Sequence, residues 1–136
     1  MSHIYYELYY HLIWATKNRE PVIDDILHDI LEKNLKTKII KLGSQLLEFN
    51  SISDHCHLLI KTVPQISISD LVGKLKGYSS YEINKLKGPK FLEWQQGFGV
   101  LSLNRKGIPF VKKYILNQKE HHRNRTTINI LEQMNV

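Results

Sequence analysis

The order in which two hydrophobic periodicities alternate along this 136-residue chain constrains its fold more than any other feature. Segments rich in aromatic and β-branched residues predict strands over Ile4 to Thr16, Gln45 to Ile52, His55 to Val63 and Phe98 to Leu103. Apolar residues at helical spacing predict helices from Asp24 to Leu42 and from near Ser67 to a stop at Gly88-Pro89. The order β-α-β-β-α-β predicts an α+β fold, the ferredoxin-like antiparallel sheet with its first and third strands in the middle.

An additional C-terminal helix is predicted after the last strand. Pro109 lies in its first turn, where a residue without an N–H is tolerated. The helix continues through Tyr114 and Gln118 toward Arg123. The tail from Thr126 to Val136 predicts one more short helix.

Composition and charge limit the size of the core and the kind of partner. With 42% hydrophobic and 24% charged residues, the chain can bury one core of moderate size, and we expect a single domain over residues 1–136. The formal net charge of +6 is compatible with a polyanionic partner, nucleic acid before anionic membrane. An ordinary basic protein explains this moderate excess about equally well.

Cysteine content and hydropathy both favour the cytoplasm. Cys56 is the only cysteine, which excludes an internal disulfide framework and fits a reducing compartment. No apolar run approaches membrane-spanning length, and the N-terminus lacks the basic-then-apolar pattern of a signal peptide. We therefore expect a cytoplasmic protein without a membrane partner.

Two histidines alternate with a cysteine at the start of the third predicted strand. Because strand side chains alternate between faces, His55 and His57 point the same way, whereas Cys56 points toward the core with Leu58 and Ile60. Two imidazoles side by side on a stiff element form half of a site for a divalent metal. Ordinary histidines on a half-exposed sheet face are the more common explanation of an isolated pair of this kind.

Zinc bound by the same histidines is a further alternative, with Cys56 or the later His121 and His122 as additional ligands. Alternation along the strand directs the Cys56 thiol away from the two imidazoles. Since the sequence holds no second cysteine, a structural zinc site is disfavoured.

Tyr114 and Gln118 are spaced for one face of the third predicted helix. Residues four apart on a helix have Cβ atoms about 5–6 Å apart, so a Gln118 amide that reaches a metal holds Tyr114 close to it. Two imidazoles and an amide oxygen suit Mg²⁺ or Mn²⁺ with open coordination positions, which a phosphate substrate requires. The alternative for Tyr114, more common for a tyrosine taken alone, is a helix-packing aromatic with an exposed hydroxyl.

Together these motifs resemble the single-tyrosine HUH transposases of bacterial insertion sequences (TnpA type), named for a histidine–hydrophobe–histidine motif. The resemblance runs from about Tyr10 to Arg125 and rests on Thr16-Lys17-Asn18-Arg19, Asp54-His55-Cys56-His57-Leu58-Leu59, Leu75-Lys76-Gly77-Tyr78-Ser79-Ser80, Tyr114-Ile115-Leu116-Asn117-Gln118 and Glu120-His121-His122. Cys56 departs from the bulkier apolar residue usual in the family, but cysteine behaves as a small hydrophobe. Gln118 favours the insertion-sequence group over relatives associated with repetitive palindromes, which tend to carry Asn-Pro near this position.

The resemblance implies a transposase that cleaves and rejoins single-stranded DNA at insertion-sequence ends through a 5′-phosphotyrosine intermediate. It implies Tyr114 as the catalytic nucleophile and His55, His57 and Gln118 as ligands of Mg²⁺ or Mn²⁺. It also implies a homodimer with active sites completed in trans, and hairpin-bearing element ends as the DNA partner. Among the basic residues, we expect DNA phosphate contacts from Lys17, Arg19, Lys61, Lys76, Lys112 and Arg123.

Two other functions are compatible with the same residues. A replication-initiator or relaxase-like nickase shares the two-histidine and tyrosine chemistry, although the short chain without a helicase or accessory domain argues against it. A non-catalytic ferredoxin-like nucleic-acid-binding module requires no chemistry from Tyr114. A covalent DNA adduct that depends on Tyr114 therefore separates the two enzymes from the binding module.

Overall fold

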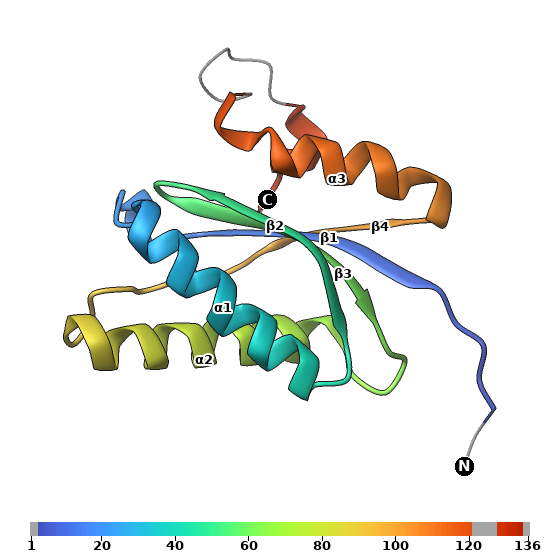
Figure 1. Ribbon diagram of the computed structural model, residues 1–136, viewed down its shortest axis with the longest axis horizontal. Coiled ribbons are helices and arrows are strands. Elements are labelled where there is room, and N and C mark those ends of the chain that lie inside the picture. Colours follow the sequence, from blue (N-terminus) through green and yellow to red (C-terminus); the bar gives the residue numbers. More distant parts are fainter. Residues whose placement is uncertain (1–2, 121–127, 135–136) are drawn as a thin grey trace.

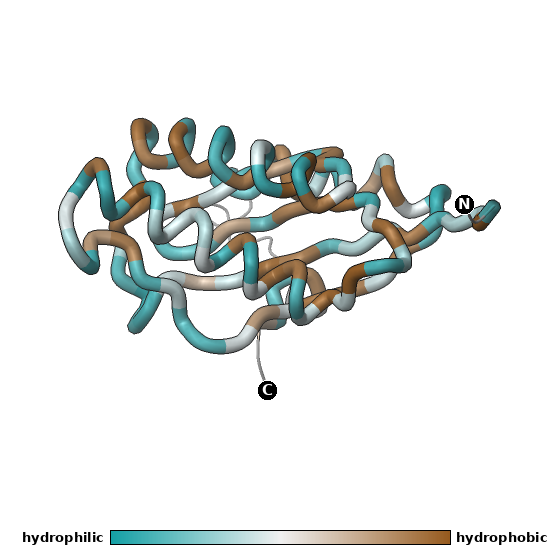
Figure 2. Tube along the Cα trace, turned by 90° about the horizontal axis from the view of Figure 1, so that it is seen from below, coloured by the Kyte–Doolittle hydropathy of each residue, from teal (hydrophilic) through white to brown (hydrophobic). Residues whose placement is uncertain are grey.

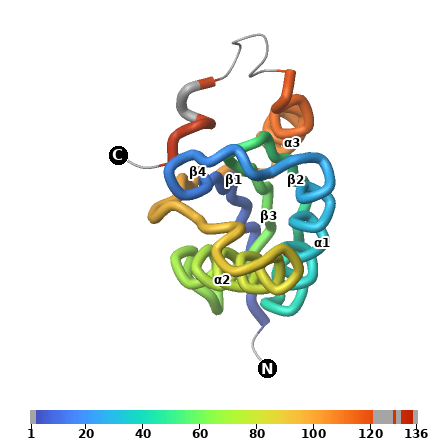
Figure 3. Tube along the Cα trace, turned by 90° about the vertical axis from the view of Figure 1, so that its left-hand side faces the viewer, coloured from blue at the N-terminus to red at the C-terminus, as the bar shows by residue number. Residues whose placement is uncertain are grey.

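Four antiparallel strands form one sheet in a computed structural model that describes residues 3–120 and 128–134. The strands β1 (Leu8–Ala15), β2 (Gln45–Ile52), β3 (His55–Thr62) and β4 (Gly99–Leu103) lie in the order β2-β3-β1-β4. The helices are α1 (Asp25–Lys41), α2 (Ile68–Lys87) and α3 (Ile108–Leu116), with 3₁₀ turns at Lys17–Arg19, Arg105–Gly107 and Asn129–Glu132. Helices α1 and α2 cover one face of the sheet and α3 lies over the other, as Figure 1 and the end-on view of Figure 3 show.

The ferredoxin-like arrangement predicted from the sequence is confirmed. Strand β3 pairs antiparallel with β1 on one side and with β2 on the other, so it is central and hydrogen-bonded along both edges. Ala15 of β1 lies opposite His55, and Trp14 lies opposite Cys56. The histidine pair therefore stands on the rigid middle of the sheet.

Capping side chains set where α1 and α2 begin. The Asp24 carboxylate accepts a hydrogen bond from the Leu27 amide at 2.8 Å, and the Ser67 hydroxyl accepts one from the Asp70 amide at 3.1 Å. Gly43 follows α1 with a φ of 84°, the left-handed conformation in which a residue without Cβ is favoured. Within the described ranges, no helix combines the length and apolar character needed to cross a bilayer.

The main core lies between the sheet and the layer of α1 and α2. Cys56, Leu58 and Ile60 of β3 point into it and are fully buried, as strand alternation predicted. The helices contribute a buried stripe that includes Leu27, Leu31, Leu35 and Ile39 of α1 and Leu71, Leu75 and Ile83 of α2. Figure 2 views this helical layer and shows apolar and polar residues alternating along both helices. Burial raises the pKa of the Cys56 thiol, which is therefore neutral packing material.

A smaller apolar cluster attaches α3 to the opposite face of the sheet. Leu59 of β3 packs with Val111 and Ile115 of α3. Because His55, His57 and Leu59 share one face of β3, this packing places α3 beside the two histidines.

Three predicted elements differ from the structure by more than one residue at a boundary or in type, and the other boundaries agree to within one residue. Strand β1 begins at Leu8 and not at Ile4, because Leu8 pairs with the last residue of β3, Thr62, and the preceding residues have no partner strand. Helix α3 ends at Leu116, and helical conformation resumes over residues 118–120. The predicted short helix of the tail is the 3₁₀ turn Asn129–Glu132 within the described part of that segment.

A side chain of β2 explains why α3 ends early. The Asn50 amide donates hydrogen bonds to the carbonyl of Ile115 at 2.9 Å and to the carbonyl of Leu116 at 3.0 Å. These are carbonyls that a continuing helix would use for itself. Asn50 thus caps the helix and fixes its C-terminal end on the sheet, next to the histidine strand.

Candidate active site

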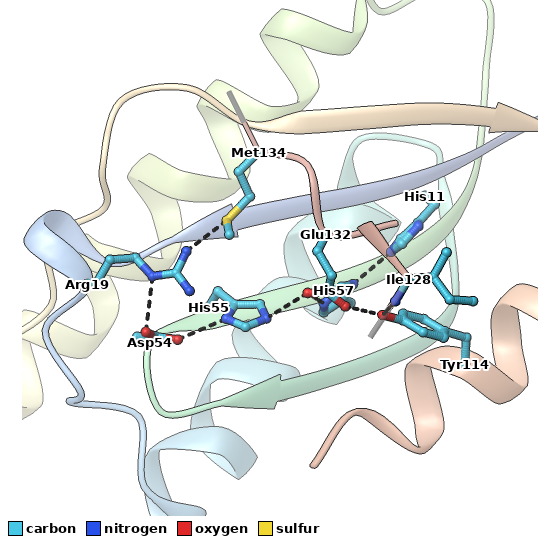
Figure 4. A network of polar contacts seen from close by, with 9 residues as sticks. All are labelled: His11, Arg19, Asp54, His55, His57, Tyr114, Ile128, Glu132 and Met134. Carbon is cyan, nitrogen blue, oxygen red and sulfur yellow. Dashed lines mark hydrogen bonds and ion pairs between the residues drawn. The ribbon is translucent and has the colours of Figure 1, made fainter. Parts of the chain in front are cut away.

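His55 and His57 lie side by side on the face of β3 that carries α3 (Figure 4). Both side chains are fully buried, and their ring centroids are 5.2 Å apart. Each ring turns Nε2 toward the same oxygen, Oε1 of Glu132, at 3.3 Å from His55 and 3.2 Å from His57. The common orientation predicted by strand alternation is confirmed, and the rings converge on one point.

Glu132 is a site residue that was not predicted from the sequence. It lies in the 3₁₀ turn Asn129–Glu132, and its Oε2 accepts a hydrogen bond from the Tyr114 hydroxyl. Burial favours the neutral acid, but hydrogen bonds from His55 and His57 outweigh burial and lower the pKa of this carboxyl. One ionised carboxylate therefore connects the histidines to the tyrosine. Glu132 is the one acidic residue of the tail from Thr126 to Val136, but no periodicity or spacing there marks it as part of a site.

Tyr114 reaches the histidines from α3. Its side chain is buried, and its ring centroid lies 6.2 Å from that of His57. The phenolic oxygen accepts a hydrogen bond from the Ile128 amide at 3.0 Å, and the fully buried side chain of Gln118 lies next to it. Burial and the hydrogen bond to Glu132 raise the pKa of Tyr114 to about 12, so the phenol is neutral near pH 7. The helical spacing predicted that Tyr114 and Gln118 lie together, and they do.

The second ring nitrogen of each histidine also has a defined partner. His55 Nδ1 lies 2.9 Å from Oδ1 of Asp54, and the other oxygen of that carboxylate accepts from Arg19 Nε at 3.0 Å. His57 Nδ1 lies 2.8 Å from Nε2 of His11, and these two rings stack at 5.0 Å. Burial and the neighbouring His57 lower the pKa of His11 to about 3, so His11 is neutral. His11 was not predicted from the sequence, where its signal was a lone polar residue within an apolar strand.

The buried donor atoms fit a divalent cation. His55, His57 and Glu132 each offer one ligand atom, and these atoms lie within 4.8 Å of one another. Gln118 adds an amide next to Tyr114. Imidazole nitrogens with carboxylate and amide oxygens are donors that Mg²⁺ and Mn²⁺ accept. The Cys56 thiol lies on the other face of β3, so the donors are nitrogen and oxygen atoms.

Two of the predicted DNA-contacting residues border this cluster. Lys17 and Arg19 follow β1 at the edge where His55 begins β3, and their side chains are 59% and 46% exposed. Arg19 has a φ of 56°, a left-handed conformation that is uncommon for residues other than glycine. In this conformation its guanidinium pairs with Asp54, which links it to the histidine site.

Lys76 instead supports the fold. Its ammonium donates hydrogen bonds to the carbonyl of Gln95 at 2.7 Å and to the carbonyl of Gly97 at 2.9 Å. Burial lowers the pKa of Lys76. Lys76 thus holds the segment that leads into β4 against α2.

The remaining predicted DNA contacts are spread over the molecule. Lys61 lies six positions after His55 along β3, about 20 Å away at the usual rise of a strand. Lys112 is exposed on α3, two positions before Tyr114. Arg123 lies outside the described residues, as do His121 and His122. Of the predicted DNA contacts, the structure links Arg19 to the histidine–tyrosine site through Asp54, and it places Lys17 at the same edge of the sheet. Lys112 projects from a different side of α3 than Tyr114, and Lys61 lies far along β3.

The backbone of the tail passes close to β4 at Gly99. A Cβ placed on Gly99 would lie 1.7 Å from the carbonyl oxygen of Gln133 and 2.8 Å from Cγ2 of Ile13. Both distances are too short for a Cβ at this position. The tail can therefore pack against β4 here because residue 99 is glycine. The position of Glu132 in the site depends on this close approach.

We expect Gly99→Ala to displace the tail, which holds Glu132 in the site. Mn²⁺ binding should weaken about 10-fold, the smaller of the losses usual when a group that supports a metal site is removed. Isothermal titration with Mn²⁺ measures the loss, and Glu132→Gln, which changes a proposed ligand itself, should lose at least as much affinity. Gly77→Ala in α2 is the control, because a Cβ there meets nothing within 4 Å. Gly77→Ala should keep Mn²⁺ affinity and gain roughly 0.5–1 kcal/mol of stability. Unchanged affinity in Gly99→Ala beside weakened affinity in Glu132→Gln would contradict the displacement.

Comparison with known sequences identifies relatives over most of the chain. Residues 4–118 match the family model described as "Transposase IS200 like". The chain is 30% identical over 123 residues to the ISDra2 transposase TnpA of Deinococcus radiodurans, covering 85% of this chain and 86% of that protein. It is 28% identical over 130 residues to the transposase for insertion sequence element IS200 of Salmonella typhimurium, covering 88% and 82%.

Solved structures give the same result. A crystal structure from Deinococcus radiodurans, assigned as a transposase, matches with a TM-score of 0.70 and 33% identity, over 87% of this chain and 95% of that one. A REP-associated tyrosine transposase bound to a REP hairpin shares the fold, with a TM-score of 0.65 and 13% identity over 90% of this chain and 74% of that one. With a matching fold and a family match over residues 4–118, the chain belongs to the IS200-like transposases, as its resemblance to the TnpA type indicated.

Proposed function

We propose that this transposase cleaves and rejoins single-stranded DNA at insertion-sequence ends through a covalent 5′-phosphotyrosine at Tyr114. One observation carries the proposal: the Tyr114 hydroxyl and both imidazoles of the HUH motif meet on the Glu132 carboxylate (Figure 4). A nucleophile and metal-binding side chains thus share one buried site. Tyrosine forms covalent intermediates when its surroundings activate it, and membership of a transposase family supports this use.

We assign the ligands of the divalent cation, Mg²⁺ or Mn²⁺, to His55, His57 and Gln118, and we add Glu132 from the tail. The support is the donor set itself, in which both Nε2 atoms converge on Glu132 and Gln118 lies against Tyr114. When bound, such a cation acts as a Lewis acid that neutralises charge on the scissile phosphate.

The protein side chains position the attacking oxygen and control its proton. With a pKa of about 12, Tyr114 must give up its proton as it attacks, and its hydroxyl already donates to Glu132. Attack forms a phosphorus–oxygen bond to Tyr114 and breaks the bond from phosphorus to the 3′ oxygen, which leaves as a 3′-hydroxyl. The phosphodiester energy is kept in the tyrosyl bond. A 3′-hydroxyl from a second DNA end can therefore reverse the step and join new partners without ATP.

For the DNA partner, we propose hairpin-bearing element ends. A structural neighbour of the same fold is bound to a REP hairpin, and Arg19 and the exposed Lys17 lie at the edge of the sheet where His55 begins β3. Such residues contact phosphates without reading sequence. The single domain over residues 1–136 and the homodimer with active sites completed in trans also stay proposals.

The polarity of the covalent bond tests this function. Wild-type protein is incubated with Mg²⁺ and single-stranded DNA that carries the element's own ends, labelled on one side or the other of the cleavage position. We expect a denaturation-resistant adduct with the fragment whose 5′ end was created by cleavage, and a free fragment ending in a 3′-hydroxyl. Joining of the two ends then separates a transposase from a nickase. Binding without an adduct, or an adduct on the opposite fragment, would sink the proposal.

A further inference from the structure

The two site histidines differ in what faces their outer nitrogen (Figure 4). Asp54 Oδ1 faces Nδ1 of His55 at 2.9 Å, and His11 Nε2 faces Nδ1 of His57 at 2.8 Å. The inner nitrogens of both rings face the same carboxylate oxygen of Glu132. Each imidazole therefore has one nitrogen toward the cluster and one toward a neighbour that the sheet or the β2–β3 turn holds in place.

Ligation imposes a requirement on these outer nitrogens. A neutral imidazole carries one proton, and the nitrogen without it is the one that binds a metal. Since Nε2 of both rings faces the cluster, ligation through Nε2 requires the proton to be on Nδ1. In the structure the same Nε2 of His57 faces the Glu132 carboxylate, and an ionised carboxylate accepts hydrogen bonds and never donates them. His57 is thus favoured with its proton on Nε2 before a cation binds and on Nδ1 afterwards.

The neighbours of the two rings meet this requirement in different ways. Asp54 is an acceptor only, and its pairing with Arg19 fixes its orientation, so it keeps a proton on Nδ1 of His55. His11 Nε2 donates to His57 in one tautomer of His11 and accepts from it in the other. The remaining nitrogen of His11, Nδ1, is buried and has no hydrogen-bond partner in the part of the chain that the structure describes. No second neighbour there commits His11 to one tautomer.

We propose that His11 is a positioning residue that lets His57 exchange tautomers when a divalent cation binds, whereas Asp54 keeps a proton on Nδ1 of His55 throughout. Without the cation, His11 Nε2–H donates to His57 Nδ1, and His57 Nε2–H donates to Glu132. With the cation, His57 Nδ1–H donates to His11 Nε2, and the proton of His11 is on Nδ1. Each of these two rings carries one proton before and after, so their charge does not change. The inference rests on the metal site of the proposed function and names His11 and Asp54 as the residues that place the protons of its two histidines.

Long-range ¹H–¹⁵N NMR spectra test the exchange directly, because they distinguish the two tautomers of each imidazole. Spectra of the ¹⁵N-labelled protein are compared without metal and with saturating Mg²⁺. We expect His57 and His11 both to change from Nε2–H to Nδ1–H, while His55 keeps a proton on Nδ1. His28, outside the site and bonded to Ser51, is the internal reference and should not change. A His57 that shows the same tautomer in both states overturns the inference.

Variants at position 11 give a second readout, the affinity for Mn²⁺ measured by titration. His11→Phe keeps a ring but removes the nitrogen that accepts from His57 Nδ1–H. We expect a loss of Mn²⁺ affinity of about 10- to 100-fold, the usual range when an outer-shell partner is removed. His11→Gln places an amide oxygen near the position of Nε2 and should recover most of the loss. His28→Phe, the matched control, should bind as the wild type does.

The outcomes separate the inference from the function on which it rests. Wild-type affinity in a folded His11→Phe overturns the role of His11. If His11→Phe does not fold, His11→Gln and the wild-type spectra decide the question. If Mg²⁺ changes neither His55 nor His57 in the wild-type spectra, the metal site itself is wrong and the proposed function fails first.

Discussion

Tyr114→Phe is expected to abolish the covalent DNA adduct completely while the protein stays folded. The substitution keeps the buried ring beside His57 and removes only the oxygen that attacks phosphorus. The Glu132 carboxylate and the Ile128 amide each lose one hydrogen bond, a cost of roughly 1–3 kcal/mol for each buried group left without a partner. Denaturing gels with labelled element ends measure the adduct, and thermal unfolding measures the fold.

Tyr78→Phe is the matched control for this result. Tyr78 lies on α2, across the sheet from the site, with the Lys38 ammonium 5.3 Å from its ring centroid. It should form the adduct at the wild-type rate. An adduct that persists in Tyr114→Phe would assign the nucleophile to another residue and return Tyr114 to a packing role.

His57→Ala should produce the second largest effect, a loss of Mn²⁺ affinity of at least about 100-fold. Loss of an outer-shell partner weakens metal binding by up to about 100-fold, and here a proposed ligand itself is removed. The change also takes away a hydrogen-bond partner of Glu132 and the stacking partner of His11. Adduct formation in Mg²⁺ should fall with the affinity. Electron paramagnetic resonance of Mn²⁺ measures the bound fraction.

His28→Ala tests whether the loss of any histidine side chain from the sheet region would have the same effect. His28 lies on α1 and its Nδ1 is 2.6 Å from the Ser51 hydroxyl, outside the metal-binding cluster. We expect unchanged Mn²⁺ affinity and unchanged cleavage. If His57→Ala binds Mn²⁺ as tightly as His28→Ala does, the histidine pair is not the metal site.

The two inactive variants together test the proposed dimer. Tyr114→Phe keeps the histidines, and His57→Ala keeps the tyrosine. If the tyrosine of one subunit serves the histidines of the other, a mixture of the two variants regains adduct formation at one composite site per mixed dimer. If each chain uses its own Tyr114, as the contacts within one chain allow, the mixture stays inactive.

The parts of the site that are set by short-range periodicity could be predicted from the sequence. Alternation along a strand placed His55 and His57 on one face and Cys56 in the core, because the period of a strand is independent of the rest of the fold. Helical spacing likewise placed Gln118 against Tyr114. The order of elements was sufficient for the sheet topology, since few arrangements of β-α-β-β-α-β bury both helices.

The residues that sequence reasoning missed depend on contacts between distant segments. His11 meets His57 only through the register of β1 against β3, across 46 positions of sequence. Glu132 reaches the site because its tail packs at Gly99, and no local pattern encodes that docking. The end of α3 at Leu116 likewise depends on Asn50 from β2. Local propensity carries no information about such partners.

The position of Cys56 between the two histidines has a consequence for metal selectivity. The side chains of His55, Cys56 and His57 carry nitrogen, sulfur and nitrogen donors in turn, but the Cys56 sulfur lies on the opposite face of the sheet from the two imidazoles. Thiophilic ions such as Cu⁺ therefore gain no soft donor here, and the site favours cations that prefer nitrogen and oxygen. A one-residue slip of β3 would exchange sulfur for the imidazoles. The fully buried Leu58 and Ile60, by fixing the register of this strand, thereby also select the element that the site can hold.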